Sequence, residues 1–231
     1  MNYHIVTVAT HNFGTLQEII NNKFNQHVEV LGFGQKWTGY MMKCELVLKY
    51  IEEKLNDDDI LIYIDGFDSI IFENPEKALK IFKEKQYKVL FSKDPEINNL
   101  HINFLKNKIF TSKKNRFNGI LNAGMWMGYV KYIKQILKEN INMKCKDDQV
   151  CLNQIANHSK YNDIIYIDYD EEIFLNIDPL SNEIYNNKAI FVSYPGTLSV
   201  ERYVRVVKDL SQFFVKEILI IWFLIRSEEH T

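Results

Sequence analysis

The sequence predicts an α/β domain with a mostly parallel central sheet that is flanked by helices. Segments typical of strands and of helices alternate from the start of the chain, which is the order that produces such a sheet. Strand candidates such as residues 60–64 are continuously apolar, and this indicates burial on both faces. Ligands of open α/β sheets bind beyond the carboxyl ends of the strands, so the first polar residues after each strand are the candidates for function.

The individual elements follow from apolar periodicity and from start signals. Apolar runs predict strands at residues 5–9, 28–31, 60–64, 88–91, 123–129, 164–167 and 189–192. Helical spacing predicts helices at residues 16–24, 41–55, 75–84, 132–139 and 148–157. The helix at 75–84 has the clearest beginning, because Asn74 is a favoured N-cap and Pro75 suits the first helical position.

The chain length of 231 residues is enough for one large domain, and we expect residues 1–211 to form it. Residues 212–225 are strongly apolar but too short to span a bilayer, so we expect a helix that is cut short. Residues 226–231 match one translated frame of a widely used sequencing adapter. We therefore expect them to be an artefact and the native C-terminus to be missing.

Charge and cysteine usage narrow the function classes. A net charge of −2 gives no reason to expect nucleic acid or an anionic membrane as a partner. Met1 runs almost directly into the first predicted strand, without a secretory signal or an evident transmembrane anchor, so the expected location is cytoplasmic. Cys44, Cys145 and Cys151 form no C-x-x-C pair, and we expect free thiols rather than a zinc site or a disulfide.

The strongest functional signal is Ile64-Asp65-Gly66-Phe67-Asp68, directly after the predicted strand at 60–64. Asp65 and Asp68 share a tight turn, so their carboxylates can converge on one cation, and hard oxygen ligands suit Mg²⁺ or Mn²⁺. Gly66 permits the turn and the close approach of a ligand. The alternative is that both aspartates are turn and capping residues.

Other phosphate and nucleotide enzymes fit the sequence less well. A haloacid-dehalogenase-type phosphatase needs Asp-x-Asp after its first strand, where this chain has Thr10-His11-Asn12. A sugar nucleotidyltransferase needs a basic, Gly-rich loop there, whereas residues 10–15 contain a single Gly and no Lys or Arg. The P-loop, G-x-G-x-x-G and G-x-S-x-G motifs are absent from the sequence. A different metal-dependent phosphohydrolase stays open as an alternative.

Two further motifs can line a sugar site. Small residues alternate with large apolar ones in 121–128, where Asn122 can hydrogen-bond a sugar hydroxyl and Gly124 leaves room for it. The alternative there is an ordinary, closely packed strand. Asp147 and Asp148 open the predicted helix at 148–157, where the helix dipole favours acidic residues. They either cap this helix or orient and deprotonate an acceptor hydroxyl.

Aromatic and basic residues supply weaker signals. Trp37 lies in the Gly-rich loop 32–39 and can stack on a base, although a core position is the alternative. Residues 106–116 contain a run of basic residues, which is typical of a solvated loop; a phosphate-binding site is the alternative. The run consists of Lys106, Lys108, Lys113, Lys114 and Arg116.

The motifs occur in a characteristic order at residues 6–10, 31–37, 64–68, 121–128, 147–149 and 173–176. In this order and approximate spacing, over roughly residues 4–211, the chain resembles the glycosyltransferase domain of the procollagen lysyl hydroxylase/glucosyltransferase family, including its relatives in large DNA viruses. The resemblance implies a GT-A fold of the nucleotide-diphospho-sugar transferase type, a UDP-sugar donor, Mn²⁺ or Mg²⁺, and a retaining transfer. No hydroxylase portion is present in the sequence.

The resemblance also implies roles for individual residues. Asp65 and Asp68 would bind the metal, and Asn122, Asp147 and Asp148 would line the sugar and acceptor pocket. The implied nucleotide site consists of Val8, Thr10, Trp37, Lys43, Phe67 and Gly196, with Thr10 and Trp37 at the uracil and ribose end and Lys43 at the diphosphate.

One position departs from the family pattern. The family's third metal ligand is a histidine in a late loop, where this chain has Ser193, a poor replacement. Together with the motifs above, the resemblance implies a metal-dependent hexosyltransferase that transfers a hexose from a UDP-sugar to a hydroxyl acceptor. The implied acceptor is hydroxylysine or galactosyl-hydroxylysine of a collagen-like protein. The alternative is a GT-A sugar-nucleotide-binding module that has lost turnover through Ser193.

Overall fold

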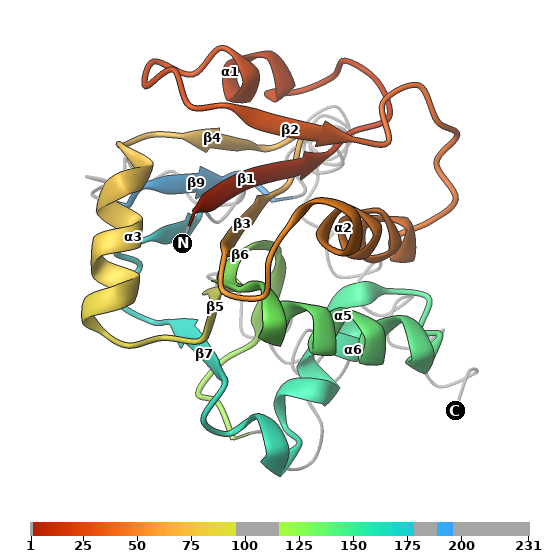
Figure 1. The fold of residues 1–231 in the computed structure, drawn as a ribbon, viewed down its shortest axis with the longest axis vertical. Coiled ribbons are helices and arrows are strands. Elements are labelled where there is room, and N and C mark those ends of the chain that lie inside the picture. Colours follow the sequence, from red (N-terminus) through yellow and green to blue (C-terminus); the bar gives the residue numbers. More distant parts are fainter. Residues whose placement is uncertain (1, 96–115, 178–188, 196–231) are drawn as a thin grey trace, which may run out of the picture. The chain divides into compact units, whose positions relative to one another are not determined.

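The computed structural model describes residues 2–95, 116–177 and 189–195, and within them six of the seven predicted strands form a sheet of order β2-β1-β3-β6-β5-β7 (Figure 1). The strands are β1 (Tyr3–Val8), β2 (Val28–Leu31), β3 (Ile60–Ile64), β5 (Val89–Lys93), β6 (Leu121–Tyr129) and β7 (Ile165–Asp168). All described residues belong to one compact unit that ends at Pro195. The predictions that the domain continues from residue 196 to 211, and those for residues 212–225 and 226–231, concern positions outside the described residues.

The sheet is mostly parallel, as predicted, with one reversal. β1 pairs in parallel with β2 and β3, and β5 pairs in parallel with β7. β6 is antiparallel to both of its neighbours, β3 and β5. A continuously apolar strand has the same sequence pattern in either direction, so the pattern of β6 did not predict that it runs antiparallel to its neighbours. As a result, the first residues of β6, not its last, lie at the carboxyl edge of the sheet.

Helices cover both faces of this sheet (Figure 1). They are α1 (Leu16–Ile20), α2 (Met41–Lys54), α3 (Pro75–Glu84), α5 (Val130–Met143) and α6 (Asp148–Ala156). Alternate residues of β3 point to opposite faces: Leu61 and Tyr63 join the core under α2, α5 and α6, whereas Ile62 joins the core with α1 and α3. Asn74 caps α3 as predicted, since its Oδ1 accepts the Glu76 N–H at 3.0 Å.

A second sheet of three short strands was not predicted as a sheet. It has the order β4-β9-β8 and is formed by β4 (Ser69–Ile71), β9 (Phe191–Ser193) and β8 (Phe174–Asn176). The strand predicted at 189–192 corresponds to β9, whereas β4 and β8, with three residues each, are too short for a periodic signal. The helix predicted at 16–24 also ends earlier, at Ile20. The Asn22 side chain binds the Ile19 and Gln26 carbonyls, and it thereby turns the chain out of the helix.

The expectation of free thiols is wrong for two of the three cysteines. Cys145 and Cys151 form a disulfide with a Cα–Cα distance of 6.0 Å. No sequence pattern indicated this disulfide, because the pairing depends on the turn between α5 and α6, where Lys144 adopts the left-handed conformation with φ 55°. Cys44 is free and buried as expected, and burial raises the pKa of its thiol to about 12.

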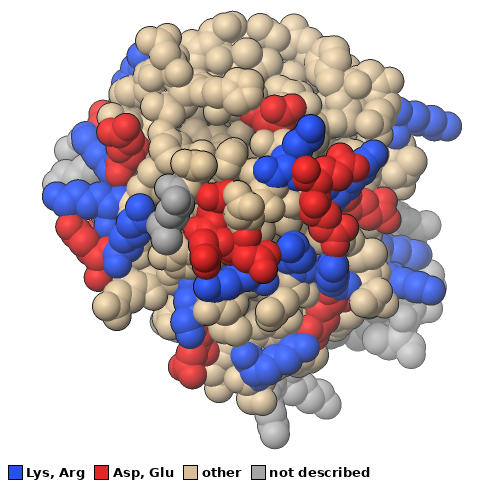
Figure 2. Space-filling view, in the orientation of Figure 1, with Lys and Arg blue, Asp and Glu red and all other residues tan. Residues whose placement is uncertain are grey.

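Charges of both signs are intermixed on the face shown in Figure 2. Ion pairs connect α5 to two neighbouring segments. Lys131–Asp58 and Lys134–Asp57 join it to the turn before β3, and Lys138–Glu52 joins it to α2. In the part of the chain that the structure describes, no helix has both the length and the apolar character needed to cross a membrane.

Arg116, at the end of the basic run, is exposed, but its guanidinium is bound to backbone carbonyl groups of the protein. Its guanidinium donates to the carbonyl oxygens of Ala156, Tyr161, Asn162 and Ile165, at 2.6, 3.1, 3.0 and 2.9 Å. It therefore ties the end of α6 to the start of β7. Lys106, Lys108, Lys113 and Lys114 lie outside the described residues.

We predict that Arg116→Lys lowers the free energy of unfolding by about 1–2 kcal/mol, because an ammonium cannot reproduce the forked donation to these carbonyls. Urea unfolding followed by circular dichroism measures this change. Lys134→Met, which removes a surface ion pair with Asp57, is the control and should change stability by less than about 0.5 kcal/mol. Equal stability of Arg116→Lys and wild type would show that these contacts add nothing.

Candidate active site

The turn from Asp65 to Asp68 lies at the carboxyl end of β3, where the sequence predicted it. It is held against both neighbouring strands. The Asp65 N–H donates to the Gly124 carbonyl of β6 at 2.8 Å. On the side of β1, a Cβ on Gly66 would lie 2.8 Å from Thr7 Oγ1 and 3.0 Å from the Val8 carbonyl oxygen. The close approach therefore requires glycine at 66.

A cleft of about 390 Å³ opens beside this turn, within the size range of small-molecule sites. The loop after β2 forms one of its walls, and Gly32, Gly34 and Gly39 of that loop have φ values of 78°, 79° and 129°, which favour glycine. The cleft is lined by Val8, Thr10, His11, Trp37, Tyr40, Lys43, Asp65, Gly66, Phe67 and Asp68.

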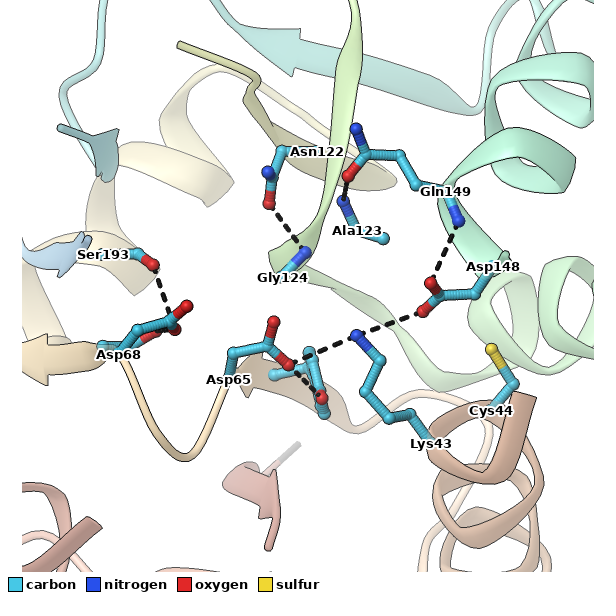
Figure 3. Close-up of polar contacts among 12 residues, drawn as sticks. Lys43, Cys44, Asp65, Asp68, Asn122, Ala123, Gly124, Asp148, Gln149 and Ser193 are labelled. Carbon is cyan, nitrogen blue, oxygen red and sulfur yellow. Dashed lines mark hydrogen bonds and ion pairs between the residues drawn. The ribbon is translucent and has the colours of Figure 1, made fainter. Parts of the chain in front are cut away.

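Lys43, in the first turn of α2, links Asp65 to Asp148 (Figure 3). Its Nζ lies 3.4 Å from Asp65 Oδ1 and 3.2 Å from Asp148 Oδ2. Burial lowers the pKa of Lys43, but the two carboxylates more than offset this and hold the pKa above its ordinary value. Tyr63 Oη donates to Asp65 Oδ1 at 2.7 Å. Burial, and then the Asp65 carboxylate, raises the pKa of Tyr63 well above that of an ordinary phenol, so it stays a donor.

Asp68 contacts two hydroxyl groups of neighbouring strands. Ser193 Oγ donates to Asp68 Oδ1 at 3.2 Å, and Ser69 Oγ lies 3.4 Å from the same oxygen. The register between β4 and β9 places Ser193 directly opposite Ser69. Burial, and then the Asp65 carboxylate, raises the pKa of Asp68 to about 6, so the neighbouring negative charges are not fully compensated within the protein.

The donor set fits a divalent cation such as Mg²⁺, which proteins hold through one or two carboxylates together with substrate phosphates and water. Asp65 and Asp68 supply hard oxygen donors, and the raised pKa of Asp68 reflects a negative charge that a cation would relieve. Among the described residues, no group of three or more His, Cys, Asp or Glu side chains could hold a metal.

Both the nitrogen and the oxygen of the Asn122 side-chain amide form hydrogen bonds within the protein. Its Nδ2 donates to Asp94 Oδ1 at 3.1 Å, and its Oδ1 accepts the Gly124 N–H at 2.7 Å (Figure 3). The next N–H, of Ala123, donates to Gln149 Oε1 at 3.2 Å. Asn122 therefore shapes the start of β6, where a Cβ on Gly124 would lie 2.8 Å from Asp65 Oδ2.

Asp147 and Asp148 do form the start of α6. Asp147 is its N-cap and accepts the N–H groups of Gln149 and Val150 through Oδ1, at 2.8 and 3.4 Å. Asp148 is buried, with one oxygen on Lys43 and the other on the Gln149 N–H at 3.0 Å. Burial raises the pKa of Asp148, although Lys43 opposes the shift.

Most of the predicted site residues meet here. Val8, Thr10, Trp37, Lys43 and Phe67 line one cleft together with Asp65 and Asp68, and Asp148 joins them through Lys43. Ser193 faces Asp68, whereas Gly196 lies outside the described residues. Several residues that line the cleft or bind its residues were not predicted from the sequence: His11, Tyr40, Tyr63, Asp94 and Gln149. For Tyr63 the available signal was a hydroxyl two residues before Asp65 in an otherwise apolar strand.

Comparison with known proteins identifies the family. A family model described as the PLOD GT domain matches residues 1–194. Procollagen-lysine,2-oxoglutarate 5-dioxygenase 2 of Mus musculus is 25% identical over 200 residues, covering 79% of this chain and 23% of the relative. The multifunctional procollagen lysine hydroxylase and glycosyltransferase of Caenorhabditis elegans is 27% identical over 195 residues, covering 78% of this chain and 26% of the relative.

The matched region is thus about a quarter of the length of these relatives. The matched residues include all the strands and helices described above, and the α/β architecture is consistent with a GT-A glycosyltransferase domain. Both results agree with the resemblance based on ordered motifs. The chain therefore belongs to the PLOD glycosyltransferase-domain family.

Proposed function

We propose that this chain transfers a hexose from a UDP-sugar to a hydroxyl acceptor, with a divalent cation, Mn²⁺ or Mg²⁺, held by Asp65 and Asp68. The observation that supports this most is the composition of one cleft, which combines an exposed tryptophan with two carboxylates and a lysine at the carboxyl edge of the sheet. Such a combination suits a ligand that has a flat base at one end and a diphosphate at the other.

The nucleotide end of the donor is assigned to the loop after β2. Trp37 is 42% exposed, and its ring contacts that of Tyr40 edge-on, at 6.1 Å between centroids. One face of the Trp37 ring can therefore stack on a base while the ring keeps its contact with Tyr40. Phe67 and His11 also line the cleft, and their rings lie 5.2 Å apart. Thr10 and Val8, at the end of β1, are further lining residues.

The diphosphate end is assigned to Lys43, Asp65 and Asp68. Lewis-acid stabilisation of the charge that develops on the departing nucleoside diphosphate is the chemistry that a bound divalent cation supplies. Asp65 and Asp68 would hold and orient the cation, and the Lys43 ammonium lies beside Asp65, where the Asp65 and Asp148 carboxylates hold it in place. The sugar carbon is expected to pass through an oxocarbenium-like state, and retention of configuration is part of the proposal because of the family.

The acceptor side is assigned to the start of α6 and β6. The name of the Caenorhabditis elegans relative, a procollagen lysine hydroxylase and glycosyltransferase, supports hydroxylysine or galactosyl-hydroxylysine as the acceptor. Both oxygens of Asp148 already accept hydrogen bonds from the protein, which favours a positioning role for it. Asp147 uses only Oδ1 as a cap among the described residues, so we assign its Oδ2 to the acceptor hydroxyl.

The first test of this proposal screens UDP-glucose, UDP-galactose, UDP-GlcNAc and GDP-mannose for Mn²⁺-dependent hydrolysis and thermal stabilisation. We predict that Asp65→Asn and Asp68→Asn abolish both effects, because each removes a charge that binds the cation. The lost stabilisation is about 2.7 kcal/mol at a ligand concentration 100-fold above the dissociation constant.

Asp168→Asn is the matched control for this experiment. Asp168 is a buried carboxylate at the end of β7, and it accepts the N–H groups of Ile173 and Phe174 at 2.8 Å. Its variant should melt earlier and keep the stabilisation by Mn²⁺ and UDP. If the Asp65 and Asp68 variants instead behave like the control, these residues are turn and capping residues.

For Trp37→Ala we expect UDP binding to weaken by about 1–3 kcal/mol, the range for a base stacked on an aromatic ring. Calorimetric titration with UDP in the presence of Mn²⁺ measures this loss. Phe33→Ala is the control, because Phe33 is 60% exposed in the same loop but is not part of the cleft lining. Unchanged UDP affinity in Trp37→Ala would remove Trp37 from the proposed site.

A second candidate function is a binding module without turnover, and the Ser193 hydroxyl on Asp68 favours it, because serine replaces a third metal ligand there. We predict that Ser193→His tightens Mn²⁺ binding, as measured in a titration with UDP present. Ser193→Ala, which removes only the hydroxyl group, should not tighten it. A folded Ser193→His variant with wild-type Mn²⁺ affinity would contradict the assignment of this position to the cation site.

A further inference from the structure

The two oxygens of the Asp65 carboxylate have different surroundings. Oδ1 accepts a hydrogen bond from Tyr63 Oη at 2.7 Å and lies 3.4 Å from Lys43 Nζ. No residue within 2–95, 116–177 or 189–195 donates to Oδ2. This second oxygen faces Gly124, where a Cβ would come within 2.8 Å of it. The protein thus binds Oδ1 of Asp65 through a hydroxyl group and a lysine, whereas Oδ2 lies against the backbone of Gly124 without a described donor.

The Tyr63 hydroxyl is held in place by the core and not by solvent. The Tyr63 side chain is 2% exposed and belongs to the cluster under α2, α5 and α6. Its ring stacks on that of Trp126 in β6, with centroids 5.1 Å apart and planes inclined by 17°. Trp126 in turn contacts Phe91 of β5, with a centroid separation of 6.2 Å. A phenol packed in this way offers its hydroxyl group at a fixed position.

We propose that Tyr63 determines how Asp65 binds a cation, and thereby which cation the site prefers. With Oδ1 bound to the Tyr63 hydroxyl, Asp65 presents a single oxygen to the cation. A single carboxylate oxygen suits a small octahedral cation such as Mg²⁺ or Mn²⁺, whereas Ca²⁺ accepts bidentate carboxylates and higher coordination numbers. This inference rests on the proposed function, because it concerns the same cation site.

The competing explanation is that Tyr63 only stabilises the fold, and a second tyrosine in the chain separates the two roles. Tyr161 is 3% exposed, and its Oη donates to a carboxylate oxygen, Glu139 Oε2, at 2.8 Å. Neither Tyr161 nor Glu139 is part of the cleft lining or of the Lys43 network. Tyr161→Phe therefore removes the same kind of hydrogen bond from the same kind of environment, away from the site.

The experiment measures Mn²⁺ binding directly, by the electron paramagnetic resonance signal of free Mn²⁺, in wild type, Tyr63→Phe and Tyr161→Phe with UDP present. Competition with Ca²⁺ gives the preference between the two cations, and thermal unfolding without ligand gives the structural cost. We expect Tyr63→Phe to weaken Mn²⁺ binding by roughly 10-fold, as losses of groups that orient a metal ligand do. We also expect its preference to shift towards Ca²⁺, while Tyr161→Phe keeps wild-type values for both.

Three outcomes overturn the inference in distinguishable ways. If wild type binds Mn²⁺ with UDP but Tyr63→Phe has the same affinity and the same preference over Ca²⁺, then Tyr63 only stabilises the fold and the proposed function stands. If wild type binds no Mn²⁺ in the presence of UDP, the proposed cation site fails and the role of Tyr63 fails with it. Equal weakening in both tyrosine variants would also overturn the inference, because the effect would then be one of general stability.

Discussion

Strand β6 runs antiparallel between β3 and β5, and this single reversal organises the candidate site. It brings the beginning of β6 to the edge where β1 and β3 end, so Gly124 can accept the Asp65 N–H and leave space beside the Asp65 carboxylate. The same edge receives Gln149, at the start of α6, through the Ala123 N–H. A parallel β6 would present its last residues here, and Asp65 would lose these neighbours.

Charge balance gives the site its chemical character. One buried ammonium, Lys43, lies between Asp65 and Asp148, while Asp68 is placed beside Asp65 with hydroxyl groups as its only described partners. Burial, and then the neighbouring Asp65 carboxylate, raises the pKa of Asp68. A diphosphate would add further negative charge to this group. In the proposed function, a divalent cation therefore compensates the negative charge of the aspartates and that of the donor's diphosphate at the same time.

The sequence predicted the parts of this arrangement that depend on local pattern. A continuously apolar strand followed by a turn located Asp65 and Asp68, and a Gly-rich loop located Trp37. The parts that depend on distant chain segments were not predictable in the same way. The direction of β6, the β4–β9 pairing and the Cys145–Cys151 disulfide all depend on which segments meet in space. Tyr63 was missed because periodicity assigns a tyrosine in an apolar strand to the core, where its ring does lie.

The second sheet makes the surroundings of the two carboxylates alike. β9 pairs with β4 and brings the Ser193 hydroxyl to Asp68 Oδ1, as Tyr63 on β3 brings its hydroxyl to Asp65 Oδ1. The Tyr194 N–H, one residue later, donates to the Asp68 carbonyl at 2.8 Å and fixes this approach. Each aspartate thus has one oxygen bound by a hydroxyl group of a strand and the other without a described donor. Serine at 193 consequently takes part in orienting Asp68, so its effect on a cation extends beyond the loss of a ligand.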